Sequence, residues 1–521
     1  MTVLKLKAAL TAGDVIKTSP SSERNVKASG GFIFKKIICC VVPVVLAAML
    51  GTGCRTYEQQ NKVIAYWHQG DLPDAVAEAT KKADENAGGK DAIVWRLEQG
   101  AVLRAAGRYD DSNKAFDEAQ VKIDEYSQMA KIRVGQEAGA LLSNQANLAY
   151  EGRSYDGIML NTYRALNYLA LGQPDNARPE IIRAYQRQQD AVADNARRIQ
   201  KTQDEAAKQK DHEVMRRAEE SLEFQAQLQG SMTNINDLQV YADYVNPFTV
   251  YLDGIYFMAN AADSSDLERA HKSLERAASF VPGNKYVRQD LAAINDLINA
   301  RPLPPTTYVI FETGCAPIRD QVRIDIPIII SKVSYIGAAF PTLRPQWNFQ
   351  HRLTVTANGI NYHTQTICKM DSIVALDFKN ELPVVITKTV AATVTKAVAA
   401  YAANQAAQQA AGDWGGLLMQ LGTAAFQIAV NIADTRTWTT LPKEFQICRF
   451  PTPADGRIEL STPNGMSLSV AIDGMADGTK NGLTSTAGVQ ASLNTGGPVN
   501  VVYVKSINSG TPLLVSQFKL K

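Results

Sequence analysis

The chain has 521 residues, which is more than one hydrophobic core usually organises, so the length predicts two or three domains. Its 54 basic residues nearly balance its 52 acidic ones, and this balance argues against a nucleic acid or an anionic membrane surface as partner. The six cysteines form no CxxC pair and no Cys/His cluster, which argues against a zinc site.

Residues 1–53 have the order of parts found in a signal peptide. The pair Lys35-Lys36 precedes an apolar run from Ile37 to Leu50. The run is short and contains Pro43, whereas a membrane-spanning helix needs about 20 apolar residues, so a permanent transmembrane anchor is the weaker interpretation. The leading basic segment is unusually long, which suggests that translation starts later, near Val26.

The stretch Leu50-Gly51-Thr52-Gly53-Cys54 resembles the bacterial lipobox, with Gly51 where a leucine is usual. The resemblance implies lipid attachment at Cys54. Because Arg55 is not an aspartate, it also implies retention at the periplasmic face of the outer membrane. The alternative is ordinary cleavage nearby, which would leave Cys54 a plain thiol.

Residues 54–300 carry helix-period apolar positions separated by glycines, and the clearest unit runs from Arg96 to Ala119. This unit is similar to a tetratricopeptide (TPR) repeat, in which small residues permit close approach of paired helices and aromatic residues fill the space between them. The matching positions are Gly100, Leu103, Gly107, Tyr109, Phe116 and Ala119. Related units begin near Gly70 and Gly172, and a last one ends at Pro282. The resemblance implies an α-solenoid; the alternative is an irregular all-helical domain.

In TPR arrays the first helix of each pair lines a concave groove. The alignment therefore assigns five residues to a partner groove, namely Val94, Leu97, Ala101, Arg104 and Ala105. This surface is mostly apolar and has a single charge, which predicts an extended or helical apolar segment of an envelope protein as its ligand.

A long charged helix or helical pair is expected over residues 185–238, which contain almost no glycine or proline. Its polar surface predicts a solvated face, with a coiled-coil contact as the alternative.

Residues 301–521 are expected to form a β-rich domain after a stiff linker at Pro302, Pro304 and Pro305, so the predicted fold class is α+β with several domains. The dipeptides Asn358-Gly359 and Asn464-Gly465 each lie between strand-like runs and predict two-residue hairpin turns.

A helical insertion is expected at residues 371–433, broken at Pro383 and near Gly412. It has few charges and many small residues, which favours a buried helical hairpin. Contact with another subunit or with a membrane remains as an alternative.

No catalytic, cofactor-binding or metal-binding motif is present in the sequence. His351 and His363 are placed on facing strands of a predicted hairpin and are interpreted as ordinary strand residues. Asp434 and Arg436 are expected to pair locally at a helix end. At most one disulfide is possible among Cys315, Cys368 and Cys448.

Four segments together resemble a poorly characterised family of bacterial envelope lipoproteins with TPR repeats. They are Tyr150–Gly172, Asn246–Phe257, FETGCAPIRD from Phe311, and DTRTW-x-x-LP from Asp434. The resemblance implies the location and the architecture and carries over no catalytic residues. The leading hypothesis for the function is a membrane-anchored, non-enzymatic protein-binding scaffold or adaptor in cell-envelope assembly or maintenance. The alternative function is an enzyme or enzyme subunit that acts on an envelope polymer through the C-terminal domain.

Overall fold

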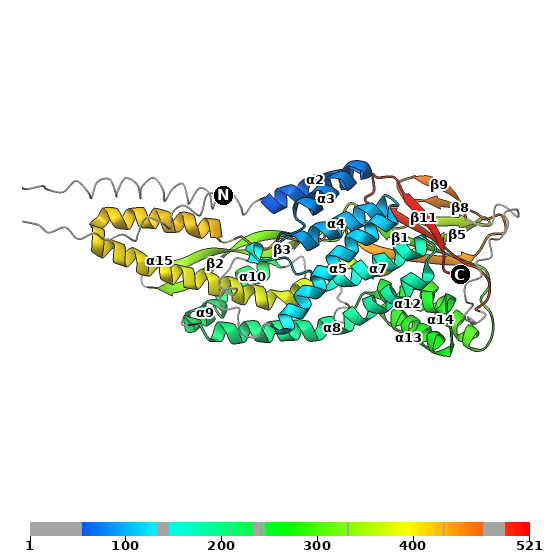
Figure 1. Ribbon diagram of the computed structural model, residues 1–521, viewed down its shortest axis with the longest axis horizontal. Helices are drawn as coiled ribbons and strands as arrows, with labels where there is room; N and C mark the ends of the chain where they lie inside the picture. The colour runs from blue at the N-terminus through cyan, green and yellow to red at the C-terminus, as the bar shows by residue number, and fades with distance from the viewer. Residues whose placement is uncertain are drawn as a thin grey trace, which may run out of the picture. The chain divides into compact units, whose positions relative to one another are not determined.

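The computed structural model describes residues 55–132, 145–209, 211–232, 241, 245–330, 333–430, 432–472 and 495–521. Within this part of the chain the protein is a mixture of helices and β-sheets, as expected for an α+β protein (Figure 1).

Helices dominate the first half of the sequence, and one long helix interrupts the strands of the second half. The helices are α2 (Arg55–Gln69), α3 (Leu72–Glu85), α4 (Ala92–Ala105), α5 (Tyr109–Ile132), the short 3-10 helix η1 (Gln145–Asn147), α7 (Ser154–Ala170), α8 (Pro174–Ala207), α9 (His212–Glu219), α10 (Leu222–Ser231), α12 (Pro247–Ala259), α13 (Ser264–Phe280), α14 (Lys285–Ile298) and α15 (Met370–Val430).

The strands form three sheets. They are β1 (Thr306–Thr313), β2 (Ile318–Ile330), β3 (Val333–Arg344), β4 (Thr354–Ala357), β5 (Ile360–His363), β6 (Gln365–Lys369), β7 (Glu444–Pro451), β8 (Arg457–Ser461), β9 (Ser467–Ala471), β10 (Val499–Ser506) and β11 (Leu514–Lys519). The largest sheet has the order β11-β10-β1-β7-β6, a second is the pair β2-β3, and a third has the order β5-β4-β8-β9.

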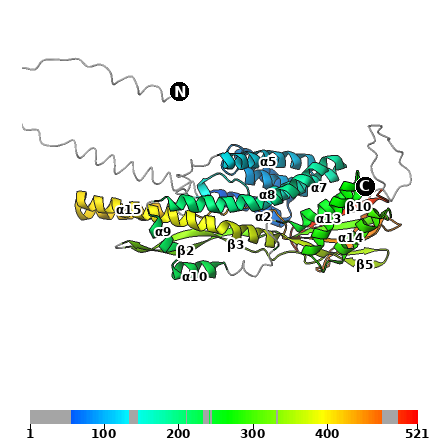
Figure 2. The ribbon, with the colours of Figure 1, turned by 90° about the horizontal axis from the view of Figure 1, so that it is seen from below.

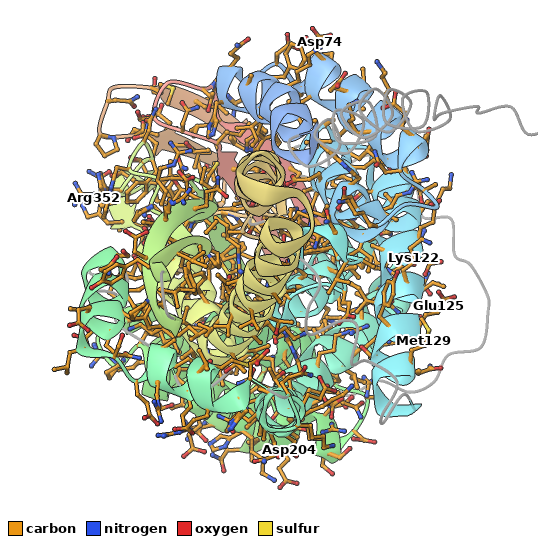
Figure 3. All side chains as sticks on the ribbon, turned by 90° about the vertical axis from the view of Figure 1, so that its left-hand side faces the viewer. Asp74, Lys122, Glu125, Met129, Asp204 and Arg352 are labelled. Atoms are coloured by element: carbon orange, nitrogen blue, oxygen red, sulfur yellow. The ribbon has the colours of Figure 1, made fainter. Side chains whose placement is uncertain are left out.

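Consecutive helices of the first half pack against each other as α2/α3, α4/α5, α7/α8 and α12/α13. Short polar side chains cap the N-termini of several of these helices. For example, Asn246 Oδ1 accepts a hydrogen bond from the backbone N–H of Thr249 at the start of α12. Gly107, with φ +74°, makes the turn between α4 and α5. The outward faces are charged, as the labelled side chains of Asp74 and Asp204 show (Figure 3). These helices are therefore amphipathic and bury their apolar faces together.

The charged segment predicted at residues 185–238 is divided between several helices. Its first part continues α8, and α9 and α10 follow after short turns. Helices α8 and α9 contact α15, and α9 and α10 contact β2, so this segment also covers part of the second half (Figure 2). The segment is therefore divided among α8, α9 and α10, and the prediction of one helix or a helical pair was wrong.

The central strand β1 pairs with β10 in parallel and with β7 in antiparallel orientation. Because side chains alternate along a strand, each strand presents two different faces. On β7, Phe445 stacks on Phe248 of α12 with 4.0 Å between ring centroids, whereas Phe450 lies against Tyr362 of β5 at 4.9 Å. The helices therefore cover one face of the large sheet, and the sheet that contains β5 contacts its other face.

Both predicted hairpins form, and the first has the predicted two-residue turn. Strands β4 and β5 pair with Ala357 opposite Ile360, and the two turn residues between them, Asn358 and Gly359, have φ of 51° and 75°. Strands β8 and β9 also form a hairpin, but its last pair is Ser461 with Ser467, so Asn464-Gly465 lies in a five-residue loop and the two-residue turn predicted there is not found; Gly465 has φ of 88°. Positive φ at Asn358 and Gly359 is what a tight hairpin turn requires.

The predicted insertion is helix α15, which continues through Pro383, so the break expected at this proline is not found. The span Met370–Ala399 is long and apolar enough to cross a membrane by length and composition, and 44% of its apolar 18-residue window is buried inside the protein. Its acidic side chains pair with basic residues of other elements. Glu381 contacts Arg153, which immediately precedes α7, and Arg319 of β2, and Asp371 contacts Lys443. These ion pairs are typical of a core helix.

Residues Gly53–Lys521 form one compact unit, so no domain boundary separates the helical half from the strand-rich half. The predicted proline linker is held in place: Leu303 is buried, its N–H donates to the Thr495 carbonyl, and its carbonyl accepts the N–H of Gly497. The expectation of two independent domains meeting near residue 300 is corrected because both halves contribute to one continuous hydrophobic core.

Candidate functional site

The residues of the predicted partner groove lie on one face of α4. Val94, Leu97, Ala101 and Arg104 are buried, and Ala105 is half-buried. The second half of the chain covers this face. Glu98 of α4 accepts hydrogen bonds from Thr439 and Thr440, which precede strand β7 of the large sheet. The groove is therefore filled, and a partner could reach it only if the sheet moved away. This corrects the expectation of an open groove at these five residues.

A polar cluster lies where α4 meets the sheet. Glu312 of β1 stands opposite Lys505 of β10, and Ile310 of β1 stands opposite Tyr503. Strand alternation places Glu312, Tyr503 and Lys505 on the same face of the sheet, toward the helices.

Glu312 is the acceptor at the centre of this cluster. Tyr163 of α7 donates its hydroxyl proton to Glu312 Oε1 at 2.8 Å. The Tyr503 hydroxyl donates to Oε2, and the Lys505 ammonium donates to Oε1. The carboxylate is thus fixed by one helix and two strands.

Arg104 of α4 approaches the same cluster from the helical side. Its Nη1 donates to Asn167 Oδ1 at 2.7 Å. Its guanidinium carbon lies 4.7 Å from the centre of the Tyr503 ring and 5.2 Å from that of Tyr163. Aromatic faces attract a cation at this range, so the rings hold the guanidinium in place.

The cluster lines a cavity of about 330 Å³, at the small end of the range for ligand pockets. Its wall is formed by α4, α7 and the large sheet, including the edge strand β11. Its rim is formed by the half-exposed residues of β11 and by the exposed turn at Gly107. The lining residues are Ala101, Arg104, Ala105, Ala106, Gly107, Tyr109, Tyr163, Glu312, Tyr503, Lys505, Leu513, Leu514, Val515 and Ser516. Three predicted groove residues, Ala101, Arg104 and Ala105, are therefore part of a real cavity.

The cavity holds ionised groups at neutral pH. Burial by itself would raise the pKa of Glu312, but the charges of Lys505 and Arg104 outweigh burial and leave this pKa below its ordinary value. Burial and the nearby Glu312 carboxylate both raise the pKa of Tyr163 and of Tyr503 well above the ordinary value, so both hydroxyls remain protonated donors.

The other sequence-based candidates lie elsewhere. Cys54 and its leader are outside the described residues. Cys315, Cys368 and Cys448 are free, buried thiols, so no disulfide joins them. Asp434 and Arg436 pair directly after α15, with Arg436 Nε 2.8 Å from Asp434 Oδ1, and this local pair was predicted. His363 lies on β5, whereas His351 precedes β4 and is outside the hairpin.

Sequence reasoning missed Tyr163, Glu312, Tyr503 and Lys505. The available signal was a charged residue inside each of two apolar strands, in the runs YVIFET and VVYVKS. A charge in an otherwise buried strand needs a partner, but the sequence does not show that these two strands are neighbours.

In the part of the chain that the structure describes, no three His, Cys, Asp or Glu side chains gather in a way that could hold a metal ion. Comparisons with protein-family models, with curated proteins and with solved structures find no match to this chain. The interpretation of the cavity therefore depends on its own geometry.

Proposed function

We propose that this chain is a non-catalytic binding protein of the bacterial cell envelope, anchored by a lipid on Cys54 at the periplasmic face of the outer membrane. It acts as an adaptor in envelope assembly or maintenance, with a protein or peptide as partner. The observation that carries the binding role is the cavity between α4, α7 and the large sheet, where buried charges surround an open space.

The position of Cys54 supports the anchor. The cysteine follows an apolar run and small residues, and charge returns at Arg55. Two acyl chains give lasting membrane retention, whereas one chain gives only marginal binding.

Close helix pairing supports the TPR-type interpretation of the helical half. A Cβ on Gly100 would lie 2.4 Å from the Phe116 ring, and one on Gly254 would lie 2.7 Å from Leu274. A small residue thus stands at the nearest approach of α4 to α5 and of α12 to α13, as such repeats require.

Because the second half of the chain covers the inner face of α4, we do not expect a partner to contact that face. The outward helical surfaces and the rim of the cavity remain accessible, so we expect the partner to contact these surfaces.

The anchor is tested by the variant Cys54→Ser in the full chain, expressed with its leader. We expect the variant to leave the membrane fraction and appear in the soluble periplasm, whereas Cys315→Ser, a matched cysteine change, stays in the membrane. Retention of Cys54→Ser after a salt wash would contradict lipid anchoring and would direct attention to the span Met370–Ala399 of α15.

The non-catalytic role is tested by incubating the purified full chain with peptidoglycan and with envelope glycans. We expect no release of soluble fragments above the level of a heat-denatured sample. Robust turnover would support the alternative function, an enzyme that acts on an envelope polymer.

A further inference from the structure

The cavity contains a cation whose contacting partners are all neutral. Glu312 is in direct contact with Lys505 and also interacts electrostatically with Arg104, so one carboxylate faces two cations. Arg104 donates to the amide of Asn167 and lies over the rings of Tyr163 and Tyr503. In the described part of the chain, no carboxylate makes an ion pair with Arg104, although this side chain is 8% exposed.

The neighbouring carboxylate of Glu98 does not change this balance. Glu98 is not among the lining residues, and its oxygens accept three hydrogen bonds from Thr439 and Thr440. The lining residues therefore carry two positive charges and one negative charge, a net charge of +1. Two buried cations that share one carboxylate leave an excess of positive charge, which is unfavourable, and an anion in the cavity would balance it.

Most of the remaining wall is apolar, and Tyr109 and Ser516 add hydroxyl groups to it. Ala101 and Ala105 of α4 contribute to it, as do Leu513, Leu514 and Val515 at and before β11. A ligand that fits this wall has a short apolar body in addition to its charged group.

We infer that the cavity binds a small organic acid, with its carboxylate on Arg104 and its apolar body between α4 and β11. One negative charge matches the net charge of the lining, which a doubly charged phosphate would exceed. A carboxylate is planar and accepts the paired donors of a guanidinium, and the rings of Tyr163 and Tyr503 already fix that guanidinium. This inference rests on the proposed binding function and assigns a ligand class to the same cavity.

The test is calorimetric titration of the full chain with three six-carbon probes: hexanoate, hexanamide and hexyl phosphate. We expect hexanoate to bind, and we expect hexanamide, which has no charge, to bind roughly tenfold or more weakly. Hexyl phosphate should also bind more weakly than hexanoate. Absence of hexanoate binding at millimolar concentration, equal binding of hexanamide, or tighter binding of hexyl phosphate would each overturn the inference.

Two variants locate the site. Arg104→Gln should weaken hexanoate binding roughly tenfold or more because it removes a charge-assisted hydrogen bond. The matched control is Arg108→Gln, which removes the same charge from an exposed residue just outside the cavity and should bind as the unmodified chain does. Unchanged affinity in Arg104→Gln would overturn the assignment.

A third variant covers the case in which Arg104→Gln does not fold. Ala105→Leu keeps every charge but fills part of the cavity from its half-buried rim, so it should also lose hexanoate binding. Normal binding in this variant would place the ligand elsewhere. Failure of these titrations, with Cys54 anchoring and lack of turnover intact, would refute the ligand class and leave the proposed function standing.

Discussion

Asp156, at the start of α7, is a buried carboxyl group that favours its protonated form. The Tyr150 hydroxyl donates to Asp156 Oδ2 at 2.5 Å and the Arg153 backbone N–H donates to the same oxygen at 2.8 Å. Burial raises the pKa of Asp156 from 3.8 to about 7, because it outweighs these hydrogen bonds and the charge of Arg153. The folded protein therefore holds this proton more tightly than the unfolded chain does.

The substitution Asp156→Asn should change how stability depends on pH. Between pH 3.8 and about 7 the folded state binds more protons at Asp156 than the unfolded state, so this group's contribution to stability falls as pH rises. Relative to the variant, the unmodified protein should lose up to about 1.4 kcal/mol per pH unit across this window. Urea denaturation of both proteins at several pH values measures the difference, and parallel pH curves would contradict the raised pKa.

Gly100→Ala should destabilise the protein although alanine favours helices. The added Cβ would lie 2.4 Å from the buried Phe116 ring, so the α4/α5 pair must separate. Overpacking of this kind costs about 1–3 kcal/mol. The control is Gly230→Ala in α10, where no atom lies within 4 Å of the new Cβ and no destabilisation is expected. Equal melting temperatures for the two variants would show that the helices do not approach this closely.

Among the elements, α15 is joined to the rest of the protein by buried ion pairs. Glu381 lies 2.6 Å from Arg319 of β2 and also contacts Arg153, which immediately precedes α7. Burial alone would raise the pKa of Glu381, but the arginines Arg153, Arg319 and Arg198 lower it below its ordinary value. The carboxylate is therefore charged and acts as the counter-ion for two buried guanidinium groups.

Glu381→Gln should weaken the attachment of α15. The change leaves Arg153 and Arg319 buried with less counter-charge, which typically costs about 3–5 kcal/mol. Chemical denaturation measures the loss. The same change at the exposed Glu213, which pairs with Arg216 and Arg217 on α9, should have little effect. If both variants unfolded at the same denaturant concentration, the buried network would not hold α15.

Elements whose geometry depends on a few neighbouring residues were predicted from the sequence. Asn358-Gly359 defines its turn locally, because both residues adopt positive φ readily, and Gly465 has positive φ in the loop between β8 and β9. Pro383 was misinterpreted as a helix break because the contacts of α15 with α7, α8 and β3 are not visible in the sequence. Packing along a helix can compensate for one hydrogen bond lost at a proline.

At the scale of the whole molecule, the sequence identified the correct face of α4 but not what covers it. Helical periodicity places Val94, Leu97 and Ala101 together, and they do lie together. Their neighbour is the sheet of β1 and β10, two strands almost two hundred residues apart in the sequence. A pairing over such a separation leaves no local signal in the sequence. The sequence therefore could not predict that Glu312 and Lys505 lie near Arg104.

Leu97→Asp tests whether the two halves form one cooperative unit. Leu97 is fully buried, so an unpaired carboxylate there should cost more than the roughly 2–5 kcal/mol of a Leu→Ala change. Hydrogen exchange should then rise together in α4 and β1, because both belong to one core. Val121→Asp, at an exposed position of α5, is the control. Faster exchange in α4 alone would contradict a shared core.

The parallel pairing of β1 with β10 also sets an order of events during synthesis. Strand β1 emerges from the ribosome long before Val499–Ser506, and until then its edge and the inner face of α4 have no cover. Exposed strand edges and apolar faces promote aggregation in nascent chains. The helical half is thus complete in sequence but unfinished in structure until the last strands arrive, and for that interval its apolar surface is unprotected.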